Sequence, residues 1–73
     1  MAFHEGQPVI WRYQRFKPVR RVYHIAAEIV YSGPLRARIR IVLSSGETVL
    51  RWVKPDILFP WTPDAVTDPY PCN

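Results

Sequence analysis

Residues 36–42 read Arg-Ala-Arg-Ile-Arg-Ile-Val, so cationic and apolar side chains alternate one by one along this stretch. Successive side chains of a β-strand point to opposite faces of a sheet. The arginines are therefore expected on one face, and the apolar side chains between them on the other. The stretch predicts a sheet with an apolar inner face and a cationic outer face. The arginines concerned are Arg36, Arg38 and Arg40.

Four other segments are also expected to form strands, because β-branched and aromatic residues dominate them and turn residues separate them. Residues 9–13 are followed by a basic connection over residues 14–21, which Pro18 marks as a loop or a sheet edge. In residues 22–31, the alternation directs Tyr31 inward with the other apolar side chains. The strands expected in chain order are residues 9–13, 22–31, 35–43, 48–53 and 57–59.

The turn at residues 44–47 is expected to close a hairpin, and its length sets the register of the two strands. Two-residue and four-residue turns in this segment both pair Ile39 with Trp52. The same register places Arg51 opposite Arg40 on the outer face and directs Trp52 into the core. Like charges directly opposite each other are destabilising, and an anionic ligand would relieve that cost.

The C-terminal part of the chain has a different composition, since five of the eight prolines lie from Pro55 onward. Residues 1–60 are expected to form the β domain, and residues 61–73 an extended, polyproline-like tail that is partly disordered. Trp61 and Tyr70 are the residues of this tail most suited to docking, because large aromatic side chains gain much from burial.

The size and the residue types limit the classes of protein. A chain of 73 residues fits one small domain. Cys72 is the only cysteine, and His4 and His24 are the only histidines, so we expect no internal disulfide, no metal site and no cofactor. No catalytic set with credible spacing and no glycine-rich phosphate loop is present, which argues against an enzyme.

The same inventory bears on the compartment. The sequence has no apolar run long enough to span a membrane and no signal-peptide pattern near Met1. A single cysteine fits a reducing compartment. We therefore expect a cytoplasmic location without membrane association.

Charge is uneven along the chain. All ten Lys and Arg residues lie in residues 1–54, where three acidic residues oppose them, which gives this part a net charge of +7. Residues 55–73 carry the three remaining acidic residues and no cation. Eight of the ten cations are arginine, whose planar guanidinium binds phosphate through two hydrogen bonds and stacks on flat rings. Charge that serves solubility alone explains the same distribution.

Three short segments carry a resemblance to a known architecture. One contains the pattern Gly-x-x-Val at residues 6–9, and another places Val53 and Leu58 on either side of a one-turn 3-10 segment. These features are similar to SH3-like small β-barrels of the Tudor and KOW types and to the C-terminal DNA-binding barrels of retroviral-type integrases. The resemblance spans residues 3–60 and implies an all-β, five-stranded SH3-like barrel that acts as a binding module. The segments are residues 3–11, 27–30 and 52–60.

A Tudor-type cage for methylated ligands would need three or four aromatic side chains that converge at one end of the barrel. The available aromatics are Trp11, Tyr13, Tyr31 and Trp52. Alternation directs Trp11 and Trp52 toward the core, so the sequence does not favour a cage.

Two basic groups are the candidate binding residues. The first, on the outer face, forms a grid at strand spacing that could follow the phosphates of a nucleic-acid backbone. A solvated face that protects the sheet and a surface for an acidic protein are the alternatives. In the second group, Tyr13 and Phe16 lie among cations and could stack on bases, although Phe16 fits equally well as a side chain that fixes the loop. The cations are Arg36, Arg38, Arg40 and Arg51 in the first group, and Arg12, Arg15, Lys17, Arg20 and Arg21 in the second.

The sequence therefore predicts a non-enzymatic module that binds DNA or RNA, largely through the backbone. The alternative is a protein-interaction or assembly module. In that case the Pro-rich tail docks on a protein partner or on a second copy of the chain through Trp61 and Tyr70.

Overall fold

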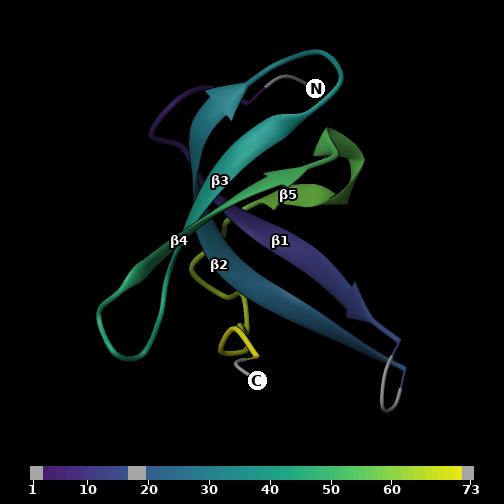
Figure 1. Ribbon diagram of the computed structural model, residues 1–73, viewed down its shortest axis with the longest axis vertical. Coiled ribbons are helices and arrows are strands. Elements are labelled where there is room, and N and C mark those ends of the chain that lie inside the picture. Colours follow the sequence, from purple (N-terminus) through teal and green to yellow (C-terminus); the bar gives the residue numbers. More distant parts are fainter. Residues whose placement is uncertain (1–2, 17–19, 72–73) are drawn as a thin grey trace.

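Five antiparallel strands form one sheet in the order β4-β3-β2-β1-β5 (Figure 1). The computed structural model describes residues 3–16 and 20–71, so Lys17, Pro18 and Cys72 lie outside the described residues. The expectation of an all-β chain with five strands is confirmed. The elements are β1 (Pro8–Arg15), β2 (Arg21–Ser32), β3 (Ala37–Val42), β4 (Thr48–Val53), the one-turn 3-10 helix η1 (Pro55–Ile57) and β5 (Leu58–Pro60).

The sheet is not closed into a barrel. Each strand pairs with its neighbour in the order above, and no ladder joins the two outer strands, β4 and β5, within the described part of the chain. Figure 1 shows the β1–β2 and β3–β4 hairpins extending in different directions, as a strongly twisted sheet requires.

The core lies on one face of the sheet, which we call the inner face, and we call the opposite face the outer face. Alternation along β3 buries Ala37, Ile39 and Ile41, each at most 1% exposed, as the sequence predicts. Burial of a large apolar side chain contributes about 1.5–3 kcal/mol, so these positions fix which face of β3 is cationic. The buried core consists of Phe3, Val9, Trp11, Ile25, Ile29, Ala37, Ile39, Ile41, Val53 and Leu58.

The β1–β2 hairpin is longer than the sequence suggests. Its ladder continues until Gln14 pairs with Val22 and Arg15 with Arg21. Residues 14–21 are expected to form a loop or a sheet edge, and of these two alternatives the loop is wrong at both ends of the segment, where residues 14, 15 and 21 lie in paired strands. A polar composition does not stop a strand whose backbone already pairs with its neighbour, because strand preference depends mostly on context.

The loop between β3 and β4 has three residues, 44–46. The Leu43 amide donates to the Glu47 carbonyl at 2.8 Å, and the Gly46 amide donates to the Leu43 carbonyl at 2.9 Å. Gly46 has a φ of +92°, a left-handed conformation that glycine adopts without steric cost. This geometry is a type I turn followed by a G1 bulge.

The three-residue loop shifts the β3–β4 register by one residue from the sequence-based prediction. Ile39 lies opposite Arg51, and Arg38 lies opposite Trp52. The predicted pairs Ile39–Trp52 and Arg40–Arg51 are therefore wrong. An odd loop length exchanges the two faces of β4, so Arg51 lies on the inner face and Trp52, which is 47% exposed, on the outer face.

A bulge in β2 moves a second aromatic residue outward. Ile29 pairs with Ile39, but the next pair is Tyr31 with Arg38, so the register shifts at Val30. The expectation that Tyr31 points inward is wrong, because an extra residue in one strand reverses the faces beyond it. Tyr31 is 48% exposed.

Residues 61–71 contain no helix or strand and return to the sheet. The Asp68 amide donates to the His24 carbonyl at 2.7 Å, and the His24 amide donates to Asp68 Oδ2 at 3.0 Å. The part of β2 that precedes Glu28 has no β3 partner, so its edge is open. The C-terminal segment covers this edge at His24, which satisfies backbone groups that would otherwise face solvent.

Candidate nucleic-acid interface

A row of three side chains crosses the outer face of β2, β3 and β4. Arg38 stands in the middle, because Tyr31 and Trp52 are its direct partners on the neighbouring strands. Side chains of directly opposite residues start ~4.5–5.5 Å apart at their Cβ atoms and so contact each other. Together with Arg36, which comes directly before β3, they form a group that we call the aromatic–arginine cluster.

Two guanidinium groups lie over the Trp52 ring. The distance from its centroid is 4.3 Å to Arg36 Cζ and 5.4 Å to Arg38 Cζ. Tyr31 meets the same ring edge-on, with 5.9 Å between centroids and 72° between the ring planes. A cation–π contact at an exposed site contributes about 0.5–1 kcal/mol, so these contacts orient the arginines. The ring carries no net charge, so the guanidinium groups are not neutralised by it.

The positive charge of the cluster is not balanced by acidic residues. Glu28 forms an ion pair with Arg40, its direct neighbour across β2 and β3. Both side chains are about half exposed, so the pair adds only ~0–1 kcal/mol to stability. Within residues 3–16 and 20–71, neither Arg36 nor Arg38 forms an ion pair, and the buried Arg38 Nε has no acceptor there.

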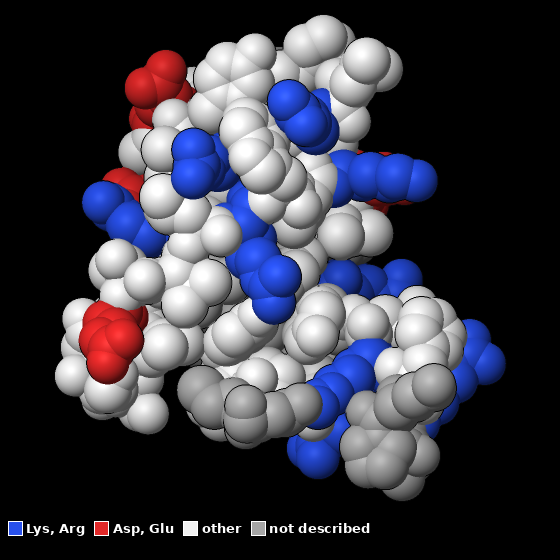
Figure 2. Space-filling model, viewed as in Figure 1, with Lys and Arg blue, Asp and Glu red and all other residues white. Residues whose placement is uncertain are grey.

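The structure brings together three of the four arginines predicted for the outer face. Arg36, Arg38 and Arg40 lie on that face, whereas Arg51 lies on the inner one because of the β4 register. Arg12 belongs to the outer face as well, since its neighbour Trp11 is in the core. Figure 2 shows Lys and Arg side chains spread over the face in view, with fewer Asp and Glu, mostly toward its margin.

The described cations of the second basic group, apart from Arg12, lie near the far end of the β1–β2 hairpin. Arg15 and Arg21 are direct cross-strand partners. Arg21 Cζ lies 4.8 Å from the Tyr23 ring centroid, and Arg20 Cζ lies 5.8 Å from that of Phe16. Phe16 is 64% exposed, so this predicted stacking residue is accessible, with a guanidinium beside it.

Tyr13, the other predicted stacking residue, lies in a cluster of aromatic rings on the inner face. Its ring centroid is 4.7 Å from that of Trp11, 6.1 Å from that of Tyr23 and 5.9 Å from that of Tyr70. The four aromatic residues considered for a cage do not converge, because Trp11 and Tyr13 face inward whereas Tyr31 and Trp52 face outward.

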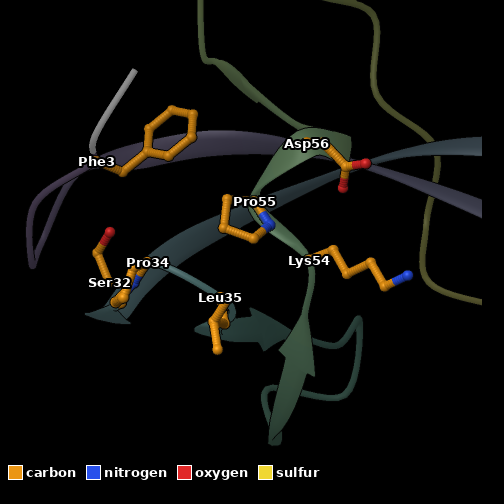
Figure 3. A pocket seen from close by; sticks show the side chains of 8 residues that line it. Phe3, Ser32, Pro34, Leu35, Lys54, Pro55 and Asp56 are labelled. Atoms are coloured by element: carbon orange, nitrogen blue, oxygen red, sulfur yellow. The ribbon is translucent and has the colours of Figure 1, made fainter.

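A depression of about 800 Å³ opens at one end of the sheet (Figure 3). Phe3, Leu35 and Pro55 contribute apolar atoms to its walls. In Figure 3, the Lys54 and Asp56 side chains extend away from Phe3, so the charged groups stand at the margin. A wide, mostly apolar hollow with its polar groups at the edge has no convergent set of donors that would orient a small ligand.

A smaller cavity of about 280 Å³ adjoins the aromatic–arginine cluster. Tyr31, Arg36 and Trp52 line one part of it, and residues 33–35 of the β2–β3 turn line the rest. The cavity therefore combines flat aromatic surface with a cation, on the same face as the unpaired arginines.

Residues 3–16 and 20–71 contain no group of three or more His, Cys, Asp and Glu side chains that could hold a metal ion. The same ranges include no helix that is long and apolar enough to cross a membrane.

Comparisons with known proteins assign the chain to no family. No family model matches it, and no curated protein or solved structure matches it. Its function must therefore be argued from the geometry of the site.

The sequence analysis missed Tyr31 and Trp52 as surface residues, although the chain contains a signal for each. Gly46 as the last of three loop residues is typical of a type I turn with a G1 bulge. Ile29, Val30 and Tyr31 are three consecutive large apolar residues. Such a run breaks the alternation and is compatible with a bulge.

Proposed function

We propose that this chain is a non-enzymatic nucleic-acid-binding domain that contacts phosphates through the outer face of its sheet. The observation that carries the proposal is the presence on an exposed face of two arginines, Arg36 and Arg38, that form no ion pair within residues 3–16 and 20–71. Guanidinium groups bind phosphate through paired hydrogen bonds. A twisted sheet presents them at intervals that suit a phosphate backbone.

The contacts are directed at the backbone, and DNA and RNA both provide them. Arg12 and Arg40 extend the surface on the same face. Arg21 lies on the inner side of the β1–β2 hairpin, over the Tyr23 ring, and is not part of this surface. A domain of this type binds non-specifically with a Kd of about 10⁻⁴–10⁻⁶ M at physiological salt. A cytoplasmic location, argued from the single cysteine, belongs to the same proposal.

The arrangement of the strands supports an SH3-like relationship as part of this proposal. The sheet is a meander in which β5 returns to pair with β1, and the 3-10 helix η1 directly precedes β5. Val53 and Leu58, on either side of η1, are both core residues. The phosphate contacts need only the outer face, so they do not depend on closure of the sheet.

The test compares two variants that each remove one exposed cation. Arg36→Ala removes a cation of the cluster, and Lys54→Ala removes one at the margin of the sheet. Fluorescence anisotropy with a labelled oligonucleotide gives Kd at several salt concentrations. Arg36→Ala should weaken binding several-fold and reduce the log–log salt slope by about 1, and Lys54→Ala should do neither. Absence of binding at low salt, or equal effects of the two variants, contradicts the proposal.

Trp61 favours a second candidate, a protein-interaction module, because this large aromatic side chain is 43% exposed beside β5. Tyr70 is less suited to that role, since it packs against the core of its own chain. Light scattering with the full chain and with Trp61→Ser tests self-association. An unchanged mass at all concentrations rules out assembly through Trp61.

A further inference from the structure

From the geometry of the aromatic–arginine cluster we infer that the nucleic acid bound here is single-stranded, and that an unpaired base stacks on Trp52 beside the β2–β3 turn. This inference rests on the proposed function, because it names the substrate class of the same surface. It depends on three observations that phosphate binding alone leaves unexplained: an exposed aromatic pair, a cavity next to it, and a glycine that makes room for one ring.

The aromatic pair offers a flat surface that a duplex has no means to use. Tyr31 and Trp52 are both nearly half exposed and meet edge-on on the outer face. In a duplex the bases are stacked on each other, and phosphates face the protein. In a single strand the base faces are free, and stacking on aromatic side chains is a main source of affinity.

The cavity beside the pair gives a base a place to enter. It has a volume of about 280 Å³, and its walls are Trp52, Tyr31, Arg36 and the turn residues 33–35. The walls are mostly apolar or aromatic, and the one charge is cationic. A flat, uncharged base attached to an anionic backbone matches this combination.

Gly33 keeps the Tyr31 ring beside the turn. A Cβ atom at Gly33 would lie 3.0 Å from Tyr31 Cε2 and 3.1 Å from the Tyr31 hydroxyl oxygen, and also 3.0 Å from the Arg36 carbonyl oxygen. These distances are tighter than most Cβ contacts, so a side chain there would shift the Tyr31 ring or the turn by a few tenths of an ångström. Glycine at this position thus maintains the shape of the cavity.

Arg36 and Arg38 determine which ligand the aromatic pair accepts. Both guanidinium groups lie over Trp52. A cationic guest, which exposed aromatic rings also attract, would be repelled by them. An anionic strand is attracted instead. The exposed Arg36 can leave the ring face for a phosphate, because stacking a base on tryptophan stabilises more than a cation–π contact at an exposed site.

The experiment uses the full chain carrying Trp61→Phe, so that Trp52 is the exposed tryptophan and Trp11 is buried. The probes are a poly-thymidine strand of about ten nucleotides and a duplex of the same length. We expect at least fivefold tighter binding of the single strand and quenching of tryptophan fluorescence on binding. In this background, Trp52→Ala should weaken single-strand binding about 5- to 100-fold and change duplex binding less than twofold.

Leu50→Ala is the matched control, because Leu50 lies on the same face of β4 and is 46% exposed, against 47% for Trp52. It should leave both affinities unchanged, and circular dichroism of each variant checks the fold. Equal binding of strand and duplex, or equal losses for the Trp52 and Leu50 variants, overturns the single-strand inference and leaves the proposed function intact. Absence of binding to either probe at low salt overturns the proposed function itself.

Gly33→Ala gives a second readout that does not remove an aromatic side chain. It should weaken single-strand binding, because it displaces the Tyr31 ring, while duplex binding and the salt slope stay the same. A Gly33→Ala variant that folds and binds the single strand as the parent does contradicts the role of the cavity.

Discussion

Arg51 of β4 and Tyr70 of the C-terminal segment are joined by hydrogen bonds on the inner face. Arg51 Nε lies 3.0 Å from the Tyr70 hydroxyl oxygen, and Arg51 Nη2 donates to the same atom. The Tyr70 ring also lies 6.0 Å from that of Trp11 on β1. Tyr70 thus connects β4, an edge strand of the open sheet, to β1. The register that moves Trp52 to the outer face also directs Arg51 toward this partner.

Tyr70→Phe and Tyr70→Ala should destabilise the chain by different amounts. The phenylalanine variant keeps the ring contacts and loses the hydroxyl, for which we expect a loss of about 1 kcal/mol in the free energy of unfolding. The alanine variant also loses the contacts with the Trp11 and Tyr13 rings, and we expect about 2–3 kcal/mol. Urea denaturation measures both. Val66→Ala, at a position 87% exposed in the same segment, should change stability by less than about 0.5 kcal/mol.

Equal stabilities of the Tyr70→Ala and Val66→Ala variants would show that Tyr70 does not stabilise the sheet. A large loss for Tyr70→Phe that matches the loss for Tyr70→Ala would assign the whole effect to the Arg51 hydrogen bonds. Stacking on Trp11 and Tyr13 would then contribute nothing measurable.

Asp68 should protect the open edge of β2 from solvent exchange. Asp68→Ala removes the acceptor of the His24 amide, so we expect faster hydrogen exchange at that amide and a loss of about 1 kcal/mol in stability. Asp68→Asn retains an oxygen acceptor and should lose less. Asp64→Ala removes an exposed carboxylate of the same segment and is the control. Unchanged exchange at His24 in the Asp68→Ala variant would contradict the edge contact.

The sequence predicts the faces of β3 because its alternation has one physical solution. Placing Ile39 and Ile41 outside would expose two large apolar side chains and bury arginines without partners, and each of these changes costs several times the thermal energy. Both isoleucines are at most 1% exposed. The inner face of β3, and with it the positions of Arg38 and Arg40, could therefore be predicted from residues 36–42 alone.

The positions of Tyr31 and Trp52 depend on single-residue events that alternation does not encode. One extra residue at Val30 reverses the face of Tyr31, and a three-residue loop reverses the face of Trp52. The β4 strand, Thr48–Val53, reads Thr-Val-Leu-Arg-Trp-Val, which offers apolar side chains to both faces, so either register satisfies its pattern. The loop conformation at Gly46 selects one of these two registers. That register places Trp52 in the candidate site and removes Arg51 from it.

Gly46→Ala should destabilise the chain through the backbone, because nothing lies within 4 Å of the position its Cβ would occupy. A φ of +92° strains any residue with a Cβ, and we expect a loss of about 1–2 kcal/mol. Gly46→Asn should lose less, since asparagine tolerates left-handed conformations. Ser44→Ala in the same loop is the control, because the Ser45 hydroxyl accepts a hydrogen bond from the Glu47 amide. Thermal or urea denaturation in which Gly46→Ala and Ser44→Ala behave alike would exclude the G1 bulge.

Glu28→Gln should strengthen nucleic-acid binding, because it removes the carboxylate that pairs with Arg40 and frees this guanidinium for a phosphate. Affinity should rise several-fold at low salt, and the log–log salt slope should become steeper by up to about 1. The exposed ion pair contributes little to folding, so the free energy of unfolding should fall by less than about 1 kcal/mol.

Glu47→Gln changes the net charge by the same amount directly before β4, and Glu47 forms no ion pair within residues 3–16 and 20–71. Anisotropy titrations of the two variants against the same oligonucleotide separate a local from a global effect of charge. If freeing Arg40 provides a phosphate contact, Glu28→Gln gains more affinity than Glu47→Gln at every salt concentration. Equal gains mean that only total charge matters, and Arg40 is then not part of the interface.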